Sequence, residues 1–167
     1  REVVYERIAA LRARVPHLTI SADVLVGFPT EDDDHFEETL ASIEDLGIAW
    51  PHVFPYSERP GTPAARIPRQ VPVAERKVRA ARVREAGSRV RARLLKAREG
   101  HEFTVLVEAA GDAGMRGRAA DYVSVRFSPE APVKTGHFYR VTAGPSDGDA
   151  VVAGAVGEAI HLRAAGV

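Results

Sequence analysis

The stretch "LTISADVLVGFPTEDDDHFEETLASIEDLGIAWPHVFPY", residues 18–56, decides the fold. A β-branched apolar run ends at Gly27, an acidic segment with helically spaced apolar residues follows, and a second apolar run closes the stretch. A strand, a crossover helix and another strand within about forty residues predict a βαβ unit with parallel neighbouring strands. We expect the first strand to be buried on both faces, as strands of parallel sheets are.

Helices are expected on either side of the first strand. Residues 1–15 carry apolar side chains at helical spacing, and Pro16 ends that run. Thr30 or Asp32 can cap the crossover helix, whose first turn is acidic and which ends at Gly47. A single βαβ unit cannot cover both faces of a parallel sheet, so residues 1–70 are expected to end a larger α/β domain.

A different pattern follows residue 70. Residues 71–100 are expected to form a long basic connecting helix, which Gly87 weakens in its middle. Four short alternating segments, separated by turn residues, then predict a small antiparallel β-barrel in the domain 101–167. The segments are 102–110, 121–128, 137–144 and 150–160. The fold class is therefore α/β followed by all-β.

Composition sets limits on function. Hydrophobic residues make up 45% of the 167 residues and charged residues 28%, which is typical of folded soluble domains. No apolar run approaches the roughly 18 to 20 residues of a membrane span, and we predict neither a signal peptide nor a membrane segment. Because cysteine is absent, this chain holds no disulfide, no thiolate zinc site and no cysteine-bound iron–sulfur cluster.

The net charge of zero conceals two segregated regions. Ten acidic residues and no Lys or Arg lie between Val15 and Glu58, whereas thirteen Lys and Arg face two Glu between Arg59 and Arg98. Such asymmetry indicates either that the acidic helix docks on the basic helix or that the basic helix binds an anionic partner. Both interpretations stay open at this point.

Residues of the first domain offer several candidate sites. A turn at the carboxyl end of a buried strand is where α/β sheets bind ligands, although Gly27-Phe28-Pro29 also suits a plain strand-to-helix turn. The acidic run 31–34 lacks calcium-loop spacing and is explained by the helix dipole, so no metal site is predicted. A histidine within an apolar strand, such as His52, is most often packed and hydrogen-bonded and is not a base or ligand. A buried carboxylate at Asp23 would be costly unless it is paired with another group.

The last domain combines basic and aromatic side chains in the way that small barrels use to bind nucleic acid. The candidate RNA-binding residues are Arg116, Arg118, Tyr122, Arg126, Lys134 and Arg140.

Two motifs together carry a family resemblance. "ISADVLVGFPTEDDDHFEETL" and "HVFPYSERPGTPAA" resemble the second half of the radical S-adenosylmethionine domain of tRNA and ribosomal-protein methylthiotransferases. The form His-Val-Phe-Pro-Tyr-Ser looks most like the branch that modifies N-threonylcarbamoyladenosine beside the tRNA anticodon. "VLVE" and "GRAADYVSV", at 105–108 and 117–125, are similar to the RNA-binding TRAM barrel that closes these enzymes.

The resemblance implies a fold, cofactors and a partner. Residues 1–70 would form the carboxyl-terminal part of a partial TIM-like (β/α) barrel, and the chain would act on tRNA in the cytoplasm with S-adenosylmethionine and iron–sulfur clusters. The residues bordering the cofactor would be Asp23, Gly27, Phe28, Pro29 and Glu31. The substrate pocket would include His52, Tyr56, Ser57, Arg59, Gly61 and Thr62.

Two departures from the family pattern bear on activity. Thr30 stands where the family has glycine, and the cluster-binding Cys-x-x-x-Cys-x-x-Cys motif and the amino-terminal domain are missing. We therefore expect a carboxyl-terminal part of a methylthiotransferase that is inactive alone. The alternatives are a stand-alone RNA-binding protein and an interaction domain whose acidic and basic helices pair with each other.

Overall fold

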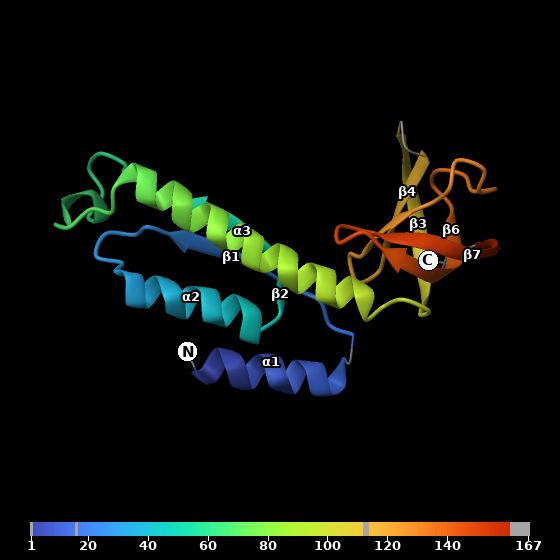
Figure 1. Cartoon of the computed structure of the whole chain (residues 1–167), viewed down its shortest axis with the longest axis horizontal. Coiled ribbons are helices and arrows are strands. Elements are labelled where there is room, and N and C mark those ends of the chain that lie inside the picture. Colours follow the sequence, from blue (N-terminus) through green and yellow to red (C-terminus); the bar gives the residue numbers. More distant parts are fainter. Residues whose placement is uncertain (1, 16, 112–113, 161–167) are drawn as a thin grey trace, which may run out of the picture. The chain divides into compact units, whose positions relative to one another are not determined.

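The computed structural model describes residues 2–15, 17–111 and 114–160 (Figure 1). The last residues of the predicted third domain, 161–167, lie outside them. Two compact units, Arg1–Arg91 and Ala92–Val167, are called here the first and second unit; the domain limits at residues 70 and 100 stay predictions. The elements are α1 (Glu2–Arg14), β1 (Ile20–Val26), α2 (Asp33–Asp45), β2 (Ile48–Pro55), a 3₁₀ turn (Ala64–Arg66), α3 (Val73–Lys96), β3 (Glu102–Gly111), β4 (Gly114–Ala119), β5 (Ser124–Arg126), β6 (Phe138–Ser146) and β7 (Val151–Ile160).

The βαβ prediction is confirmed, since β1 and β2 pair in parallel with Ala22 opposite Pro51 and Val26 opposite Pro55. The Tyr56 N–H just beyond β2 donates to the Val26 carbonyl at 2.8 Å. Backbone direction alternates along a strand, so residues 51 and 55 turn away from β1, where a missing N–H costs no ladder bond. This alternation explains why β2 tolerates two prolines.

The expectation that β1 is buried on both faces is wrong. Ser21, Asp23 and Leu25 are exposed, and β2 likewise exposes His52 and Phe54 on alternate positions. In Figure 1, α2 and α3 lie beside the sheet, and α1 lies beyond α2, to which Tyr5 and Arg12 connect it. A two-stranded sheet covered from one side leaves its other face open. The predicted partial TIM-like barrel is not confirmed by these two strands.

Gly87 lets α3 approach β2 closely. A Cβ at Gly87 would lie 2.4 Å from Cδ of Pro51, so this position excludes any side chain. The sequence reading of Gly87 as a weak point of the helix missed this contact. The predicted long basic helix itself is confirmed as α3.

Ion pairs join α2 to α3 within the first unit. Arg82 meets Glu37 at 2.7 Å and Arg89 meets Glu44 at 3.2 Å. The acidic helix and the basic helix therefore do dock on each other, as one of the two charge interpretations expected.

No helix among the described residues is long and apolar enough to cross a bilayer.

The second unit contains a closed barrel with strand order β3-β4-β5-β7-β6. The predicted small barrel is present, but it is not antiparallel throughout, because β5 and β7 run parallel. A closed ring with an odd number of strands cannot alternate direction at every step, so at least one pair must be parallel. The core consists of buried side chains such as Val105, Val107, Val125, Val141 and Val151.

The sequence analysis missed β4. Its sequence, "GMRGRA", contains no β-branched residue and two glycines, so strand propensity gives no signal there. A Cβ at Gly117 would lie 2.6 Å from Cγ1 of Val105 and 2.7 Å from the Leu106 carbonyl oxygen. The glycine that hides the strand is thus the residue that lets it pair tightly with β3.

Candidate functional site

The turn after β1 is built around Gly27. Its φ of +72° lies in the left-handed region, and an added Cβ would lie 2.4 Å from Cγ of Arg76. The Gly27 N–H donates to Oε1 of Glu31 at 2.9 Å, and the Glu31 N–H donates to the Phe28 carbonyl at 2.9 Å. Glu31 therefore closes the turn and fixes its backbone.

Thr30 occupies the family's glycine position and keeps a glycine-like backbone. Its φ is +76°, a conformation that costs a non-glycine residue about 1–2 kcal/mol. The Thr30 N–H donates to the carbonyl of Arg69 at 3.1 Å, which ties the turn to the connector before α3. The substitution thus retains the turn with backbone strain.

Tyr56 lies beside this turn at the end of β2. Its ring meets Phe28 edge-on at 5.4 Å between centroids, and the Arg76 guanidinium carbon lies 5.0 Å from the ring centroid. Tyr56 is buried, and its hydroxyl has no hydrogen-bond partner among the described residues. An unsatisfied buried hydroxyl is unfavourable, which marks this end of the sheet as a place where another polar group fits.

The buried Arg76 joins the two strand ends to α3. Its Nε donates to the carbonyl of Val71 at 2.7 Å, and one terminal nitrogen donates to the carbonyl of Tyr56 at 2.9 Å. The sequence analysis did not single out this residue, because it reads as one cation among many on a basic helix. Only the packing of α3 shows that it supports the Gly27 turn.

Arg79 organises the acidic segment. Its guanidinium lies 2.7 Å from Glu31, 2.8 Å from Asp33 and 3.1 Å from Glu75, and the side chain is 5% exposed. Burial would lower the pKa of Arg79, but hydrogen bonds and charge interactions with Glu31 and Glu75 outweigh it and raise the pKa. This second missed arginine therefore stays charged.

The acidic run 31–34 has structural partners. Asp32 caps α2, because its carboxylate accepts the N–H of His35 at 3.0 Å. That backbone hydrogen bond chiefly holds the pKa of Asp32 below its ordinary value of 3.8. In the part of the chain that the structure describes, no three His, Asp or Glu side chains are grouped to hold a metal.

The remaining candidates of the first unit lie apart from the Gly27 turn. Pro29 is buried in the turn, whereas Asp23 and His52 face each other in register on the open sheet face and are both exposed. The loop after β2 leaves Ser57, Arg59 and Gly61 exposed and Thr62 half-buried. The structure thus groups Gly27, Phe28, Pro29, Glu31 and Tyr56, and leaves Asp23, His52, Ser57, Arg59, Gly61 and Thr62 outside that group.

In the second unit, three predicted RNA-binding arginines line one hollow of about 510 Å³, called here the barrel hollow. Arg118 pairs with Glu108 at 3.1 Å, and Arg126 pairs with Asp147. Arg116 forms no ion pair with any residue of the described ranges. The arginines thus differ in how far carboxylates already neutralise them.

Tyr122 and Arg118 line a neighbouring hollow of about 420 Å³ together with Phe138 and Leu106. Tyr122 is 68% exposed, has a φ of +66°, and its carbonyl accepts a hydrogen bond from Arg118 at 3.4 Å. An exposed ring beside a guanidinium suits a stacked base and its phosphate. Phe138 was not predicted as a site residue. The alternation of apolar residues along a strand does not tell whether such a side chain lies in the core or lines a surface hollow.

Lys134 and Arg140 are exposed but line neither of these hollows. The Lys134 N–H donates to the hydroxyl of Tyr139 at 3.0 Å, and Arg140 lies opposite Thr104 in the β3–β6 pair. The barrel therefore brings together four of its six predicted RNA-binding residues.

The chain is similar in sequence to known tRNA-modifying enzymes. No family model matches the chain. It is 38% identical over 138 residues to a tRNA-2-methylthio-N(6)-dimethylallyladenosine synthase of Corynebacterium urealyticum, covering 79% of the chain and 26% of the relative. It is 41% identical over 130 residues to the synthase of the same name from Novosphingobium aromaticivorans, covering 77% and 29%. It is 43% identical over 108 residues to the threonylcarbamoyladenosine tRNA methylthiotransferase MtaB of Rickettsia prowazekii, covering 65% and 25%.

The chain belongs to the radical S-adenosylmethionine methylthiotransferase family and corresponds to a carboxyl-terminal part of it. It spans about a quarter of the length of these curated relatives.

Proposed function

We propose that the chain is the carboxyl-terminal part of a tRNA methylthiotransferase, to which it supplies one wall of the cofactor site and an RNA-binding barrel. The observation that carries this proposal is the junction of the two family motifs: the Gly27 turn and Tyr56 meet at the carboxyl ends of two parallel strands. Ligands of open and barrel-shaped α/β sheets bind at that end.

The first unit would form the last strands of a partial (β/α) barrel. The open sheet face, with Asp23, Leu25 and Phe54 exposed, fits a strand face that lines the interior of such a barrel. S-adenosylmethionine would border Asp23 and the residues from Gly27 to Glu31. In the complete enzyme the family's iron–sulfur cluster, which would be held by cysteines outside this chain, would supply the electron for cleavage of S-adenosylmethionine.

The substrate side would lie nearer β2 and the loop that follows it. Tyr56 offers its buried hydroxyl there, while His52, Ser57 and Arg59 are exposed and available for a ligand. Gly61 and Thr62 shape the loop, since Oγ1 of Thr62 donates to the carbonyl of Arg59 at 2.8 Å. Proline and glycine in this loop fix a turn that presents polar groups.

The barrel would bind tRNA in the cytoplasm. Arg116, Arg118 and Arg126 line one hollow, and Tyr122 extends the surface with an exposed aromatic ring. Phosphate contacts by arginine supply most of the affinity for a nucleic acid, and aromatic stacking adds to it. Lys134 and Arg140 would contribute from outside the hollows.

We further propose N-threonylcarbamoyladenosine as the nucleoside. The motif "HVFPYS" and the relative from Rickettsia prowazekii support it, whereas the names of the other two relatives favour dimethylallyladenosine. The complete gene can be expressed in cells that lack endogenous methylthiolation, and the tRNA nucleosides then analysed by mass spectrometry. This experiment tests both the methylthiotransferase function and the choice of nucleoside. The 2-methylthio form of threonylcarbamoyladenosine is expected. A methylthiolated dimethylallyladenosine would overturn only the nucleoside, and no methylthio product would overturn the function.

A further inference from the structure

The loop between β2 and α3, residues 57–72, follows the same end of the sheet as the Gly27 turn, and we call it the arginine loop. Its sequence contains one acidic residue, Glu58, and three arginines. All three arginines are exposed, and none forms an ion pair with any residue of the described ranges; they are Arg59, Arg66 and Arg69. The arginine loop is therefore a positively charged surface.

The backbone of the arginine loop is held at both ends by one side chain. The buried guanidinium of Arg76 donates to the carbonyl of Tyr56 at 2.9 Å and to the carbonyl of Val71 at 2.7 Å. Within the loop, Nε2 of Gln70 donates to the carbonyl of Ile67 at 3.0 Å. The exposed arginines thus belong to a fixed backbone, which lowers the entropy cost of binding a partner.

A further hydrogen bond joins the arginine loop to the Gly27 turn. The carbonyl of Arg69 accepts the N–H of Thr30 at 3.1 Å. Both residues have a positive φ, +59° at Arg69 and +76° at Thr30, so the contact joins two unusual backbone conformations. The arginine loop therefore adjoins the end of the sheet where the proposed function has the cofactor and the target nucleoside.

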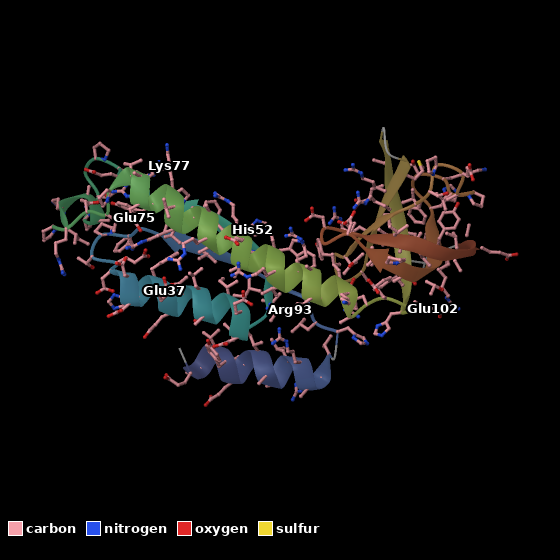
Figure 2. All side chains as sticks on the ribbon, in the orientation of Figure 1. Glu37, His52, Glu75, Lys77, Arg93 and Glu102 are labelled. Atoms are coloured by element: carbon pink, nitrogen blue, oxygen red, sulfur yellow. The ribbon has the colours of Figure 1, made fainter. Side chains whose placement is uncertain are left out.

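The carboxylates around the arginine loop already have a cationic partner. Figure 2 shows Glu75 at the start of α3, just after the loop, and Glu75 pairs with Arg79 at 3.1 Å. Glu31 and Asp33 of the acidic segment pair with the same guanidinium at 2.7 and 2.8 Å. Because Arg79 engages these acidic groups, the charges of the arginine loop stay uncompensated.

We propose that the arginine loop binds phosphate groups of an unpaired stretch of tRNA beside the target nucleoside. A guanidinium binds phosphate oxygens through two parallel hydrogen bonds and keeps its charge at physiological pH. An acidic polypeptide is the other polyanion that such a surface attracts, but the position of the loop at the substrate end of the sheet favours RNA. The inference rests on the proposed function and adds a second RNA contact, outside the barrel.

Two measurements on the chain with unmodified tRNA transcript test the inference. Phenylglyoxal modifies accessible arginines, and mass spectrometry of peptides compares the modification of each arginine with and without tRNA. Fluorescence anisotropy of labelled tRNA gives the affinity from low to high salt for Arg66→Gln and Arg69→Gln. Arg7→Gln is the matched control, because Arg7 is exposed on α1 and forms no ion pair with any described residue.

We expect tRNA to slow the modification of Arg59, Arg66 and Arg69 severalfold and to leave Arg7 as reactive as before. Each loop variant should weaken binding about fivefold to tenfold at low salt and lower the salt slope by about 0.7, the value for one phosphate contact on a single strand. Arg7→Gln should bind like the wild type.

Three results would overturn the inference, and they separate it from the proposed function. Binding by anisotropy with unprotected loop arginines, and with Arg66→Gln and Arg69→Gln equal to Arg7→Gln, would reject the arginine loop alone. Protection by polyglutamate as strong as by tRNA would assign the loop to an acidic polypeptide instead. A complete lack of tRNA binding at low salt would reject the proposed function and this inference with it.

Discussion

The β1–β2 sheet and the barrel bury their strands in different ways. Leu25 and Phe54 on the open face of the sheet are 49% and 52% exposed, whereas Val105, Val125 and Val151 of the barrel are fully buried. A closed barrel removes the free edges of its sheet, but a two-stranded parallel sheet can bury only the face that its helices cover. The barrel can therefore present a complete surface by itself, and the sheet can contribute only part of a site.

The two units also differ in what stabilises them. Charged contacts around Arg79 connect the Gly27 turn, α2 and α3, while the barrel relies on buried valines and on close contact at Gly117. Substitutions at these positions should consequently destabilise one unit and spare the other.

The largest effect is expected for Arg79→Ala. Removing one member of a buried ion-pair network leaves Glu31 without its cationic partner, and this lowers the free energy of unfolding by about 3 kcal/mol. Urea unfolding followed by Trp50 emission measures the first unit. Hydrogen exchange of β3 amides measures the barrel, which we expect to be unchanged.

Arg82→Ala is the matched control, because its pair with Glu37 is half exposed and such pairs contribute at most about 1 kcal/mol. Equal losses in Arg79→Ala and Arg82→Ala would contradict the central position of Arg79.

Gly117→Ala should destabilise the barrel alone, by about 1–3 kcal/mol, as overpacking of a tight site does. The new Cβ meets the Leu106 carbonyl at 2.7 Å, and backbone cannot move aside as a side chain can. Faster hydrogen exchange of β3 and β4 amides is the expected readout, with Thr104→Ala on the exposed side of β3 as the control. Unchanged exchange would show that β3 and β4 are less tightly paired.

Gly87→Ala should destabilise the first unit by about 1–2 kcal/mol. This loss is expected even though alanine is favoured over glycine within a helix by about 1 kcal/mol. The cause is the 2.4 Å approach of a Cβ to Pro51. Chemical denaturation of the variant measures the loss, and the double variant Gly87→Ala with Pro51→Ala should recover most of it. A stabilised Gly87→Ala would show that α3 and β2 are not in close contact.

The smallest effect concerns the pH dependence of the α2 cap. Because the pKa of Asp32 is lowered in the folded protein, its ionised form stabilises folding above the ordinary value of 3.8, and that stabilisation is lost as pH falls through the lower folded pKa. Asp32→Asn keeps a capping side chain but does not titrate. The stability difference between wild type and Asp32→Asn should shrink between pH 6 and pH 3; a constant difference would contradict it.

The sequence predicted most individual helices and strands well, but it predicted poorly how strands that are distant in the sequence pair with each other. The βαβ unit was readable because residues 18–56 alternate between strand and helix periodicity, and the barrel was readable from its turn spacing. β4 was not, since "GMRGRA" has no strand propensity, and the parallel β5–β7 pair depends on how the ring closes. No local pattern records such closure.

The candidate site shows the same limit. The motifs pointed to Gly27 and Tyr56, which the structure brings together, but Arg76 and Arg79 looked like any other cations of a basic helix. Their role depends on which face of α3 meets the Gly27 turn. Likewise, the positive φ of Thr30 is visible only in the folded backbone.

The most direct test of the central claim is the affinity of the chain for unmodified tRNA, measured from low to high salt, for wild type and for the triple variant Arg116→Gln, Arg118→Gln and Arg126→Gln. We expect log affinity to fall linearly with log salt in the wild type, and the triple variant to bind more weakly with a slope reduced by about 2. Equal affinity and slope in both proteins, or no binding at low salt, would contradict an RNA-binding role for the barrel.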